Sequence, residues 1–401
     1  MVKEVFIMRR VKKRLCKLTA LCLMISGLRM GVHANTPAQE FQSGSYILME
    51  ASSGKVLLEH NSHEPLPPAS ITKVMTMLLI YEAVEQGKIT WEDEVAISEH
   101  AAHMGGSQVY MEPGEIQTVR DLLKCIAIAS ANDAAVAMGE YIAGSEEGFA
   151  DLMNKRATDL GMKNTHFKNA CGLHSEGHVS SAYDIAILSR ELMTQFPQVS
   201  EILTIWMDSI IHKTRRGESE FGLTNTNRLI KAYTGVTGLK TGYTSQSKHC
   251  MSATANRNDM DLIAVVLAAP DSKVRFKEAA KLLDHGFANY VVKKGHKKDE
   301  VLGQAPVFKG DKTQLEYKVK DTMSMVLPKD KGNEEISHTI TINPNLTAPI
   351  QKGDTVGNAA YFIGENHIGD IPLVAAFDIH KAKYNHMLKY IFRSYFMPHG
   401  N

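Results

Sequence analysis

The chain has 401 residues, of which 44% are hydrophobic and 22% charged, a balance typical of a globular protein with room for two or three domains. Its 45 basic and 44 acidic side chains give a net charge of +1, which excludes the strongly basic surface of a nucleic-acid-binding protein.

The first 34 residues have the three parts of a secretory signal peptide. A basic head over residues 3–17 precedes an apolar run over residues 18–28, and the segment ends at Ala34, a small residue suited to cleavage. An N-terminal membrane anchor is the less favoured alternative, because the apolar run is too short to span a bilayer comfortably. Cleavage would remove eight basic residues and one acidic residue, leaving 37 and 43 and a net charge of −6. Three cysteines would remain, an odd number that argues against a disulfide framework.

Residues 45–50 and 55–60 are expected to form a hairpin, and an apolar segment that follows Ser70 predicts a buried helix ending near Gly87. Ser70 suits the helix N-terminus, and Lys73 shares its face three residues on. Because this lysine lies near the positive helix end and apolar residues, it should lose its proton readily and could serve as the base for Ser70. The alternative is that Ser70 is an ordinary cap. Ser-x-x-Lys occurs three times, but only this copy opens a long apolar helix.

The middle of the chain is predicted to be helical, and strands return after it. Thr118 and Asp133 are expected to cap two of the helices, and Gly144 to end one. The predicted helices lie at 119–129, 134–143, 147–160, 182–194 and 272–287, and the later strands at 236–244, 249–255 and 262–269. Strands at both ends with helices between them predict an α+β domain over residues 35–290, an antiparallel sheet of distant segments plus a helical cluster.

The composition changes near residue 291. Short alternating runs separated by turn residues predict a small all-β domain over residues 291–378. Residues 379–401 then carry an apolar stripe at helical spacing with basic flanks, which predicts an amphipathic helix suited to lying in a membrane interface. The alternative is a helix docked on its own domain.

Two further short motifs accompany Ser70 and Lys73. Ser130-Ala131-Asn132 and Lys240-Thr241-Gly242 each occur once, at spacings of 60 and then 110 residues. Each motif alone is weak, since Ser130 and Asn132 could be capping residues and Lys240 a solvated lysine. Together the three motifs are the signature of penicillin-binding proteins and class A β-lactamases.

With its flanking residues, the set resembles the D-alanyl-D-alanine carboxypeptidases, which are low-molecular-mass penicillin-binding proteins. The segments are Pro68-Ala69-Ser70-Ile71-Thr72-Lys73, Ile128 to Ala135 and Gly238 to Thr244. Residues 104–108 and 225–229 resemble the branch of this family in endospore-forming Gram-positive bacteria. The likeness covers essentially the whole chain.

The resemblance implies a β-lactamase/transpeptidase-like catalytic domain followed by the β domain and the C-terminal amphipathic helix. It implies an exported enzyme, bound peripherally at the outer face of the cytoplasmic membrane, that needs no metal or cofactor. Its substrate would be the D-Ala-D-Ala end of the peptidoglycan stem pentapeptide, and β-lactam antibiotics would acylate it. The branch also links the expected role in wall synthesis to sporulation.

The resemblance assigns the catalytic roles to three side chains. Ser70 would attack the carbonyl of the penultimate D-alanine and form an acyl-enzyme that water hydrolyses. Lys73 would take the serine proton, and Ser130 would relay a proton to the leaving D-alanine. The backbone N–H groups of Ser70 and Tyr243 would form the oxyanion hole.

Substrate binding falls to the other motif residues. Asn132 would bind the amide groups of the peptide, and Lys240 and Thr241 its terminal carboxylate. Gly242 would let the substrate lie along its strand.

The sequence departs from the family pattern at one place. Some members carry an arginine inside the Asn-x-Asn stretch before Lys-Thr-Gly, where this chain has Thr226, with Arg228 two residues on. The resemblance therefore leaves open which residue supports Lys240. Residues 212–222 are also polar, which predicts a different loop near the site.

Several other functions are less favoured. A β-lactamase would need a Glu-x-x-Leu-Asn loop, which is missing between Asn132 and Lys240. A DD-endopeptidase or transpeptidase on the same fold, and a non-catalytic membrane-bound wall-binding protein, remain alternatives. Metal binding by the histidine pairs at 100 and 103 or at 174 and 178 is disfavoured because a third ligand is missing.

Overall fold

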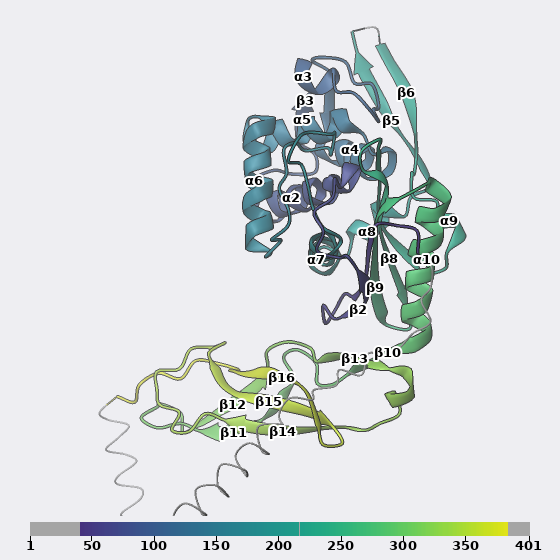
Figure 1. Ribbon diagram of the computed structural model, residues 1–401. Helices are drawn as coiled ribbons and strands as arrows, with labels where there is room; N and C mark the ends of the chain where they lie inside the picture. The colour runs from purple at the N-terminus through teal and green to yellow at the C-terminus, as the bar shows by residue number, and fades with distance from the viewer. Residues whose placement is uncertain (1–40, 216, 384–401) are drawn as a thin grey trace, which may run out of the picture. The chain divides into compact units, whose positions relative to one another are not determined.

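A five-stranded antiparallel sheet forms the centre of the first domain in the computed structural model of the chain, which describes residues 41–215 and 217–383 (Figure 1). Its order is β2-β1-β9-β8-β7, so the first strands lie beside strands from about 200 residues later, as predicted. The strands are β1 (Ser45–Glu50), β2 (Val56–His60), β7 (Val236–Thr244), β8 (Lys248–Arg257) and β9 (Met260–Ala269).

Helices cover both faces of this sheet. On one face, Leu262 of β9 packs against Gly286 of α10 (Ser272–Asn289). On the other face, Ile263 and Val265 belong to the core shared with the helical cluster. Burial on both faces explains why β9 reads as an almost continuous apolar run.

The helical cluster surrounds α2, whose residues Lys73 to Leu78 are all buried. The predicted all-round apolar helix is therefore confirmed. Its helices are η1 (Ala69–Thr72), α2 (Lys73–Glu85), α3 (Glu99–Ala102), α4 (Val119–Lys124), η2 (Cys125–Ala129), α5 (Asn132–Ala143), α6 (Glu146–Asp159), α7 (Ala182–Gln195), α8 (Val199–Leu203) and α9 (Leu229–Ala232).

Two local predictions need correction. The helix expected over residues 119–129 divides into α4 and the π-helical turn η2, which ends at Ser130 with a left-handed φ of 62°. Asp133 is not the cap of α5, since α5 already begins at Asn132. Its buried carboxylate instead accepts hydrogen bonds from the N–H groups of Val109 and Met111.

Two antiparallel strand pairs were not predicted. In one, β3 (Glu94–Ala96) pairs with β4 (Ile116–Thr118), and in the other, a hairpin, β5 (Met207–Thr214) pairs with β6 (Gly217–Thr224). Most side chains of β5 and β6 are polar and at least partly exposed, so no apolar alternation marks them in the sequence.

The small all-β domain is confirmed, and it has a core of its own. Its larger sheet has the order β11-β12-β16-β15-β14, and β10 pairs with β13. Its strands are β10 (Tyr290–Lys294), β11 (Val301–Pro306), β12 (Gln314–Val319), β13 (Ser324–Pro328), β14 (Ile336–Ile342), β15 (Thr355–Ile363) and β16 (Asn366–Ala375), with η3 (Lys329–Lys331) after β13. Ile379 and Lys381 add isolated bridges to this domain.

The predicted signal peptide, residues 1–34, lies outside the described residues. So do residues 384–401, which hold most of the predicted C-terminal amphipathic helix. Within the described ranges, no helix has the length and apolar character needed to cross a membrane.

Candidate active site

Ser70 lies in the single turn η1, directly before α2. It is not the cap of α2, because Lys73 is the first residue of that helix and Thr72 precedes it. Ala69 has a left-handed φ of 48°, and this turn sets the position of the serine. The Lys73 Nζ lies 3.2 Å from the Ser70 Oγ, so the predicted pair is in hydrogen-bond contact.

The Lys73 amine is fully buried and has two further partners. It donates to the Asn132 Oδ1 at 2.6 Å and to the backbone carbonyl of Cys171 at 2.7 Å. Burial lowers the pKa of Lys73 to about 8, although the nearby Cys171 and Asp133 partly oppose this shift. In the neutral amine, two N–H groups can keep both carbonyl partners, and the lone pair then faces the Ser70 hydroxyl.

The orientation of the Asn132 amide is fixed by the segment before it. Its Nδ2 donates to the Gly105 carbonyl at 2.6 Å, and its backbone N–H donates to the Ser107 carbonyl at 2.7 Å. A Cβ on Gly106 would lie 2.7 Å from the same Nδ2. The segment 105–107 therefore turns the amide oxygen toward Lys73.

The Cys171 carbonyl is held by a tight loop that sequence reasoning missed. The Asn169 Oδ1 accepts hydrogen bonds from the N–H groups of Cys171 and Gly172. Gly172 has a φ of 85°, and a Cβ there would lie 1.9 Å from the Ala69 carbonyl oxygen. The signal in the sequence was Asn169-Ala-Cys-Gly, a turn-forming pattern with nothing to show that it reaches Ser70.

His178 contacts η1 through the side chain of Thr72. The Lys168 N–H donates to its Nδ1, so its Nε2 carries the proton and donates to the Thr72 Oγ1 at 2.8 Å. Burial lowers the pKa of His178 to about 4, which keeps the ring neutral. Both of its nitrogens are thus engaged, one with Thr72 of η1 and the other with the Lys168 backbone, which explains one of the histidines considered for metal binding.

Ser130 lies on the helical side of the site, and Thr226 connects that side to β7. Ser130 is 4% exposed and follows η2 in the strained left-handed region. The Thr226 N–H donates to the Ile128 carbonyl, and the Thr241 Oγ1 donates to the Thr226 Oγ1 at 2.7 Å. Thr226 therefore links the second motif to the third.

Gly242 lies on β7, the edge strand of the sheet, where the chain passes close to η1. A Cβ on Gly242 would lie 3.0 Å from the Pro68 carbonyl oxygen and 3.1 Å from the Ser70 nitrogen. The glycine is thus already needed for the packing of η1 against β7. Tyr243, next along the strand, is 60% exposed, and its ring stacks on His249 with centroids 4.5 Å apart.

Arg275 is the residue of the site that sequence reasoning missed most clearly. It comes from α10, is 7% exposed, and donates from its Nη1 to the carbonyls of Gly242 at 2.9 Å and Cys250 at 3.3 Å. Burial lowers its pKa to about 10, so it remains a cation at neutral pH. An isolated arginine in an amphipathic helix carries no signal that it reaches the sheet.

Three buried basic side chains, those of Lys73, Lys240 and Arg275, therefore lie close together. Burial and the positive charges of Lys73 and Arg275 place the pKa of Lys240 well below its usual range. None of the three forms an ion pair with a carboxylate within residues 41–215 and 217–383. Such a cluster favours a bound anion, because the anion would relieve the mutual repulsion.

The predicted site residues come together to different degrees. Ser70, Lys73 and Asn132 are joined by direct hydrogen bonds, and Gly242 contacts the backbone of Ser70. Lys240 interacts with Lys73 through its charge. The others take their places through the backbone of η2 and β7: Ser130, Thr241 and Tyr243.

Comparison with known proteins gives consistent matches. A family model for D-alanyl-D-alanine carboxypeptidases matches residues 31–271, and one for the C-terminal domain of penicillin-binding protein 5 matches residues 290–381. The chain is 43% identical over 348 residues to D-alanyl-D-alanine carboxypeptidase DacF of Bacillus subtilis, covering 87% of this chain and 88% of that one. It is 35% identical to DacC of Escherichia coli, over 84% of each chain. The solved structure of penicillin-binding protein 5 from Haemophilus influenzae has a TM-score of 0.74 at 30% identity and covers 85% of this chain and 98% of its own.

Proposed function

The chain belongs to the D-alanyl-D-alanine carboxypeptidase family, and from this premise we propose that Ser70 is the nucleophile with which it removes the terminal D-alanine from peptidoglycan stem pentapeptides. As a member of this family it is a serine-type hydrolase that acts as a carboxypeptidase on the cell wall. The observation that carries the assignment is the buried Lys73 amine, 3.2 Å from the Ser70 hydroxyl.

The reaction begins with proton transfer from the Ser70 Oγ to neutral Lys73. The oxygen attacks the carbonyl carbon of the penultimate D-alanine, and the N–H groups of Ser70 and Tyr243 stabilise the oxyanion. Ser130 passes a proton to the departing amine, so the C–N bond breaks and an acyl-enzyme remains. Water then attacks the ester and restores the Ser70 hydroxyl.

The cluster of basic side chains formed by Lys73, Lys240 and Arg275 attracts the terminal carboxylate of the substrate. Lys240 and Thr241 contact it, and Arg275 supports them from behind β7, through the carbonyls of Gly242 and Cys250. Asn132 binds the amide groups of the peptide with its remaining hydrogen-bonding capacity. Because β7 is the edge strand of the sheet, an extended peptide can align beside it as a further strand.

Each of the four parts of the chain has a separate role in this proposal. Residues 1–34 direct export, residues 35–290 carry catalysis, residues 291–378 form the β domain and residues 379–401 bind the membrane surface. The enzyme then acts at the outer face of the cytoplasmic membrane, where peptidoglycan is its substrate and β-lactams acylate Ser70. A role in sporulation belongs to the same proposal and rests on the likeness of residues 104–108 and 225–229 to the spore-forming branch.

The test is D-alanine release from a peptide ending in D-Ala-D-Ala, by residues 35–383 and by their Ser70→Ala variant. We expect release by the parent only, and penicillin labelling by the parent only, while both chains unfold at the same temperature. Labelling that survives in Ser70→Ala would overturn the nucleophile assignment. Penicillin labelling without D-alanine release would instead favour an endopeptidase, a transpeptidase or a wall-binding role.

A further inference from the structure

The two edges of the larger β-domain sheet differ in how they are protected. At one edge, β11 has a bulge between Val301 and Gly303 and ends at Pro306, and both features hinder pairing with another strand. At the other edge, β14 pairs with β15 through seven consecutive residues without a bulge. Its sequence, Ile-Ser-His-Thr-Ile-Thr-Ile, has no lysine, proline or glycine. An edge with these properties is suited to strand pairing.

The backbone of β14 has a full set of groups directed away from β15. The Asn343 N–H donates to the Val356 carbonyl at 2.9 Å, which fixes that pair as a hydrogen-bonded one. Hydrogen-bonded and non-hydrogen-bonded pairs alternate in an antiparallel ladder. Asn343 bonds inward to β15, so the residue before it, Ile342, and every second residue before Ile342 direct their N–H and C=O groups outward. These residues are Ile336, His338, Ile340 and Ile342.

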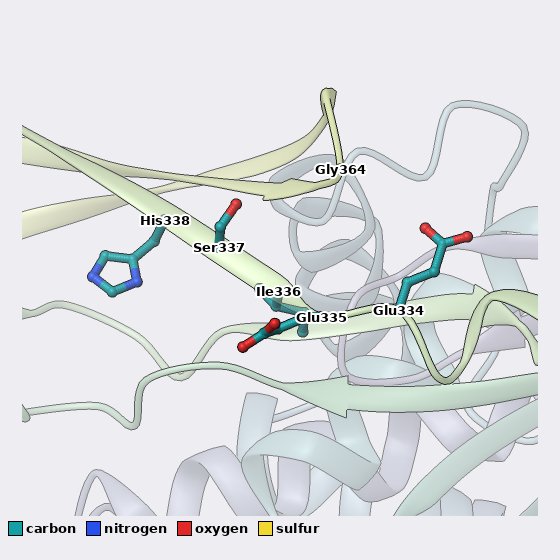
Figure 2. Close-up of a pocket in the computed structure, with 6 residues that line it drawn as sticks. All are labelled: Glu334, Glu335, Ile336, Ser337, His338 and Gly364. Carbon is teal, nitrogen blue, oxygen red and sulfur yellow. The ribbon is translucent and has the colours of Figure 1, made fainter.

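The side chains of β14 fall on two different faces. Ile336, Ile340 and Ile342 are packed against the core of the β domain, whereas Ser337 and Thr339 are exposed. Figure 2 shows Ser337 and His338 leaving the strand on different sides. An open hollow lies beside the start of the strand, lined by Glu334, Glu335, Ile336, Ser337, His338 and Gly364.

We propose that β14 pairs antiparallel with β14 of a second copy of this chain. The outward residues are spaced symmetrically about Thr339, so a two-fold axis there pairs all of them. Ile336 then exchanges hydrogen bonds with Ile342 of the second copy, and His338 does so with Ile340. A shift by two residues in either direction would leave outward groups unpaired, which selects this register.

The side chains also match in this register. The apolar residues of one copy continue the apolar face of the other, and Ser337 lies opposite Thr341, a pair of hydroxyl groups suited to cross-strand contact. No two like charges meet within the strand, since β14 contains no lysine, arginine, aspartate or glutamate. A self-complementary edge of this kind fits a second copy better than an unrelated peptide.

Cross-linking of the purified full chain tests the register. In the proposed pair the two Thr339 residues face each other as a non-hydrogen-bonded pair with Cα atoms about 4.5 Å apart, within disulfide range. Under mild oxidation Thr339→Cys should give a disulfide-linked dimer, and the matched variant Gln304→Cys, on exposed β11, should not. The parent chain is the second control. Its Cys125, Cys171 and Cys250 are buried, and any linkage through Cys16 or Cys22 would appear in the parent as well as in both variants. Equal cross-linking of the two variants, or none by Thr339→Cys, would overturn the proposal.

Charge variants test the same contact without oxidation. Thr339→Lys and Thr339→Glu should each abolish the dimer seen by sedimentation of the parent, because like charges meet at the axis. An equimolar mixture should recover a heterodimer. Each variant should keep the thermal unfolding profile and circular dichroism of the parent, which shows that the β domain, with its separate core, is folded. A parent that sediments as a monomer at all concentrations, or a mixture without heterodimer, would refute pairing with a second copy and leave an outside strand as the partner.

Discussion

At the scale of single residues, the chemistry rests on a lysine whose burial is compatible with losing its charge. Lys73 donates to two neutral carbonyl groups and contacts the neutral Ser70 hydroxyl, so its environment does not demand an ammonium ion. Burial is the largest cause of its lowered pKa. In the mechanism we propose, such a lysine activates the serine without a histidine.

The pH dependence of acylation follows from this pKa. The folded enzyme needs neutral Lys73, so the second-order rate constant for penicillin acylation should rise with pH and level off above about pH 8. Well below this value it should fall about tenfold for each pH unit. Stopped-flow measurement with a labelled penicillin would check this. A midpoint near 10.5, the ordinary value, would contradict it.

Lys73→Arg is the matched variant for that experiment. Its guanidinium keeps the positive charge but stays protonated at every accessible pH. We expect acylation to be lost across the whole range and thermal stability to fall, because a larger and permanently charged group would then be buried. A variant that retained the pH profile of the parent would show that the titrating group is a different residue.

Arg275 should act on substrate binding more than on the chemical step. Removing a charged hydrogen-bond donor from the two carbonyls, together with its charge, should raise KM for a D-Ala-D-Ala peptide by about tenfold or more in Arg275→Met. Arg275→Lys keeps the charge but cannot reproduce the contacts of the guanidinium with the two carbonyls. Its KM should therefore lie between those of the parent and Arg275→Met. Steady-state kinetics with thermal unfolding as a control would decide. An unchanged KM in Arg275→Met would contradict the assignment.

At the scale of elements, the position of Ser70 is set by three segments that converge on η1. The loop at Gly172 contacts the Ala69 carbonyl, His178 binds Thr72, and β7 packs closely at Gly242. None of these segments is adjacent to η1 in the sequence. A short turn has few hydrogen bonds of its own, so its geometry depends on such neighbours.

Substitution of Gly172 should show this dependence. Gly172→Ala introduces a Cβ 1.9 Å from a backbone oxygen at a φ of 85°, which would displace η1 and Ser70. We expect a destabilisation of about 1–3 kcal/mol and a clear loss of penicillin acylation. The measurements are thermal unfolding and the acylation rate.

Gly177→Ala is the matched control. Its φ of 77° is similar, but a Cβ there would lie 3.7 Å from the Lys168 side chain, an ordinary contact. The Gly177→Ala substitution should therefore lower the free energy of unfolding by about 1 kcal/mol and leave acylation intact. If the two variants behaved alike, backbone strain alone would explain both, and the loop would not position Ser70.

At the scale of the whole molecule, the chain has two separate hydrophobic cores, one in the catalytic domain and one in the β domain. The bridges made by Ile379 and Lys381 show that the β domain uses residues that the predicted membrane helix was thought to contain. A truncation that tests the membrane helix should therefore keep these residues.

Deletion of residues 384–401 should release the exported enzyme from membranes. The apolar stripe in that segment would otherwise bind the interface, and its loss leaves the described domains unchanged. Cell fractionation with labelled penicillin would locate the enzyme. A deletion that still sedimented with membranes would contradict the anchor. Full penicillin labelling and an unchanged thermal unfolding profile of the released form would confirm that both domains are folded.

The fold class, the order of the domains and the family could all be predicted from the residue pattern. Periodicity marked the α2 helix and the strands β7, β8 and β9, because these elements are long and apolar. The joint occurrence of three short motifs in a fixed order predicted Ser70, Lys73 and their partners as the site. These features are local, so they can be read from neighbouring residues.

The surroundings of those motifs, by contrast, become visible only in the folded chain. The Cys171 carbonyl that binds Lys73, the histidine that holds Thr72 and the arginine behind Gly242 come from segments 33 to 106 residues away. Their roles arise from backbone carbonyls and buried contacts, which leave no distinctive residue pattern. Burial is likewise a property of the folded chain, and it lowers the pKa of Lys73 to a value at which this lysine can act as a base.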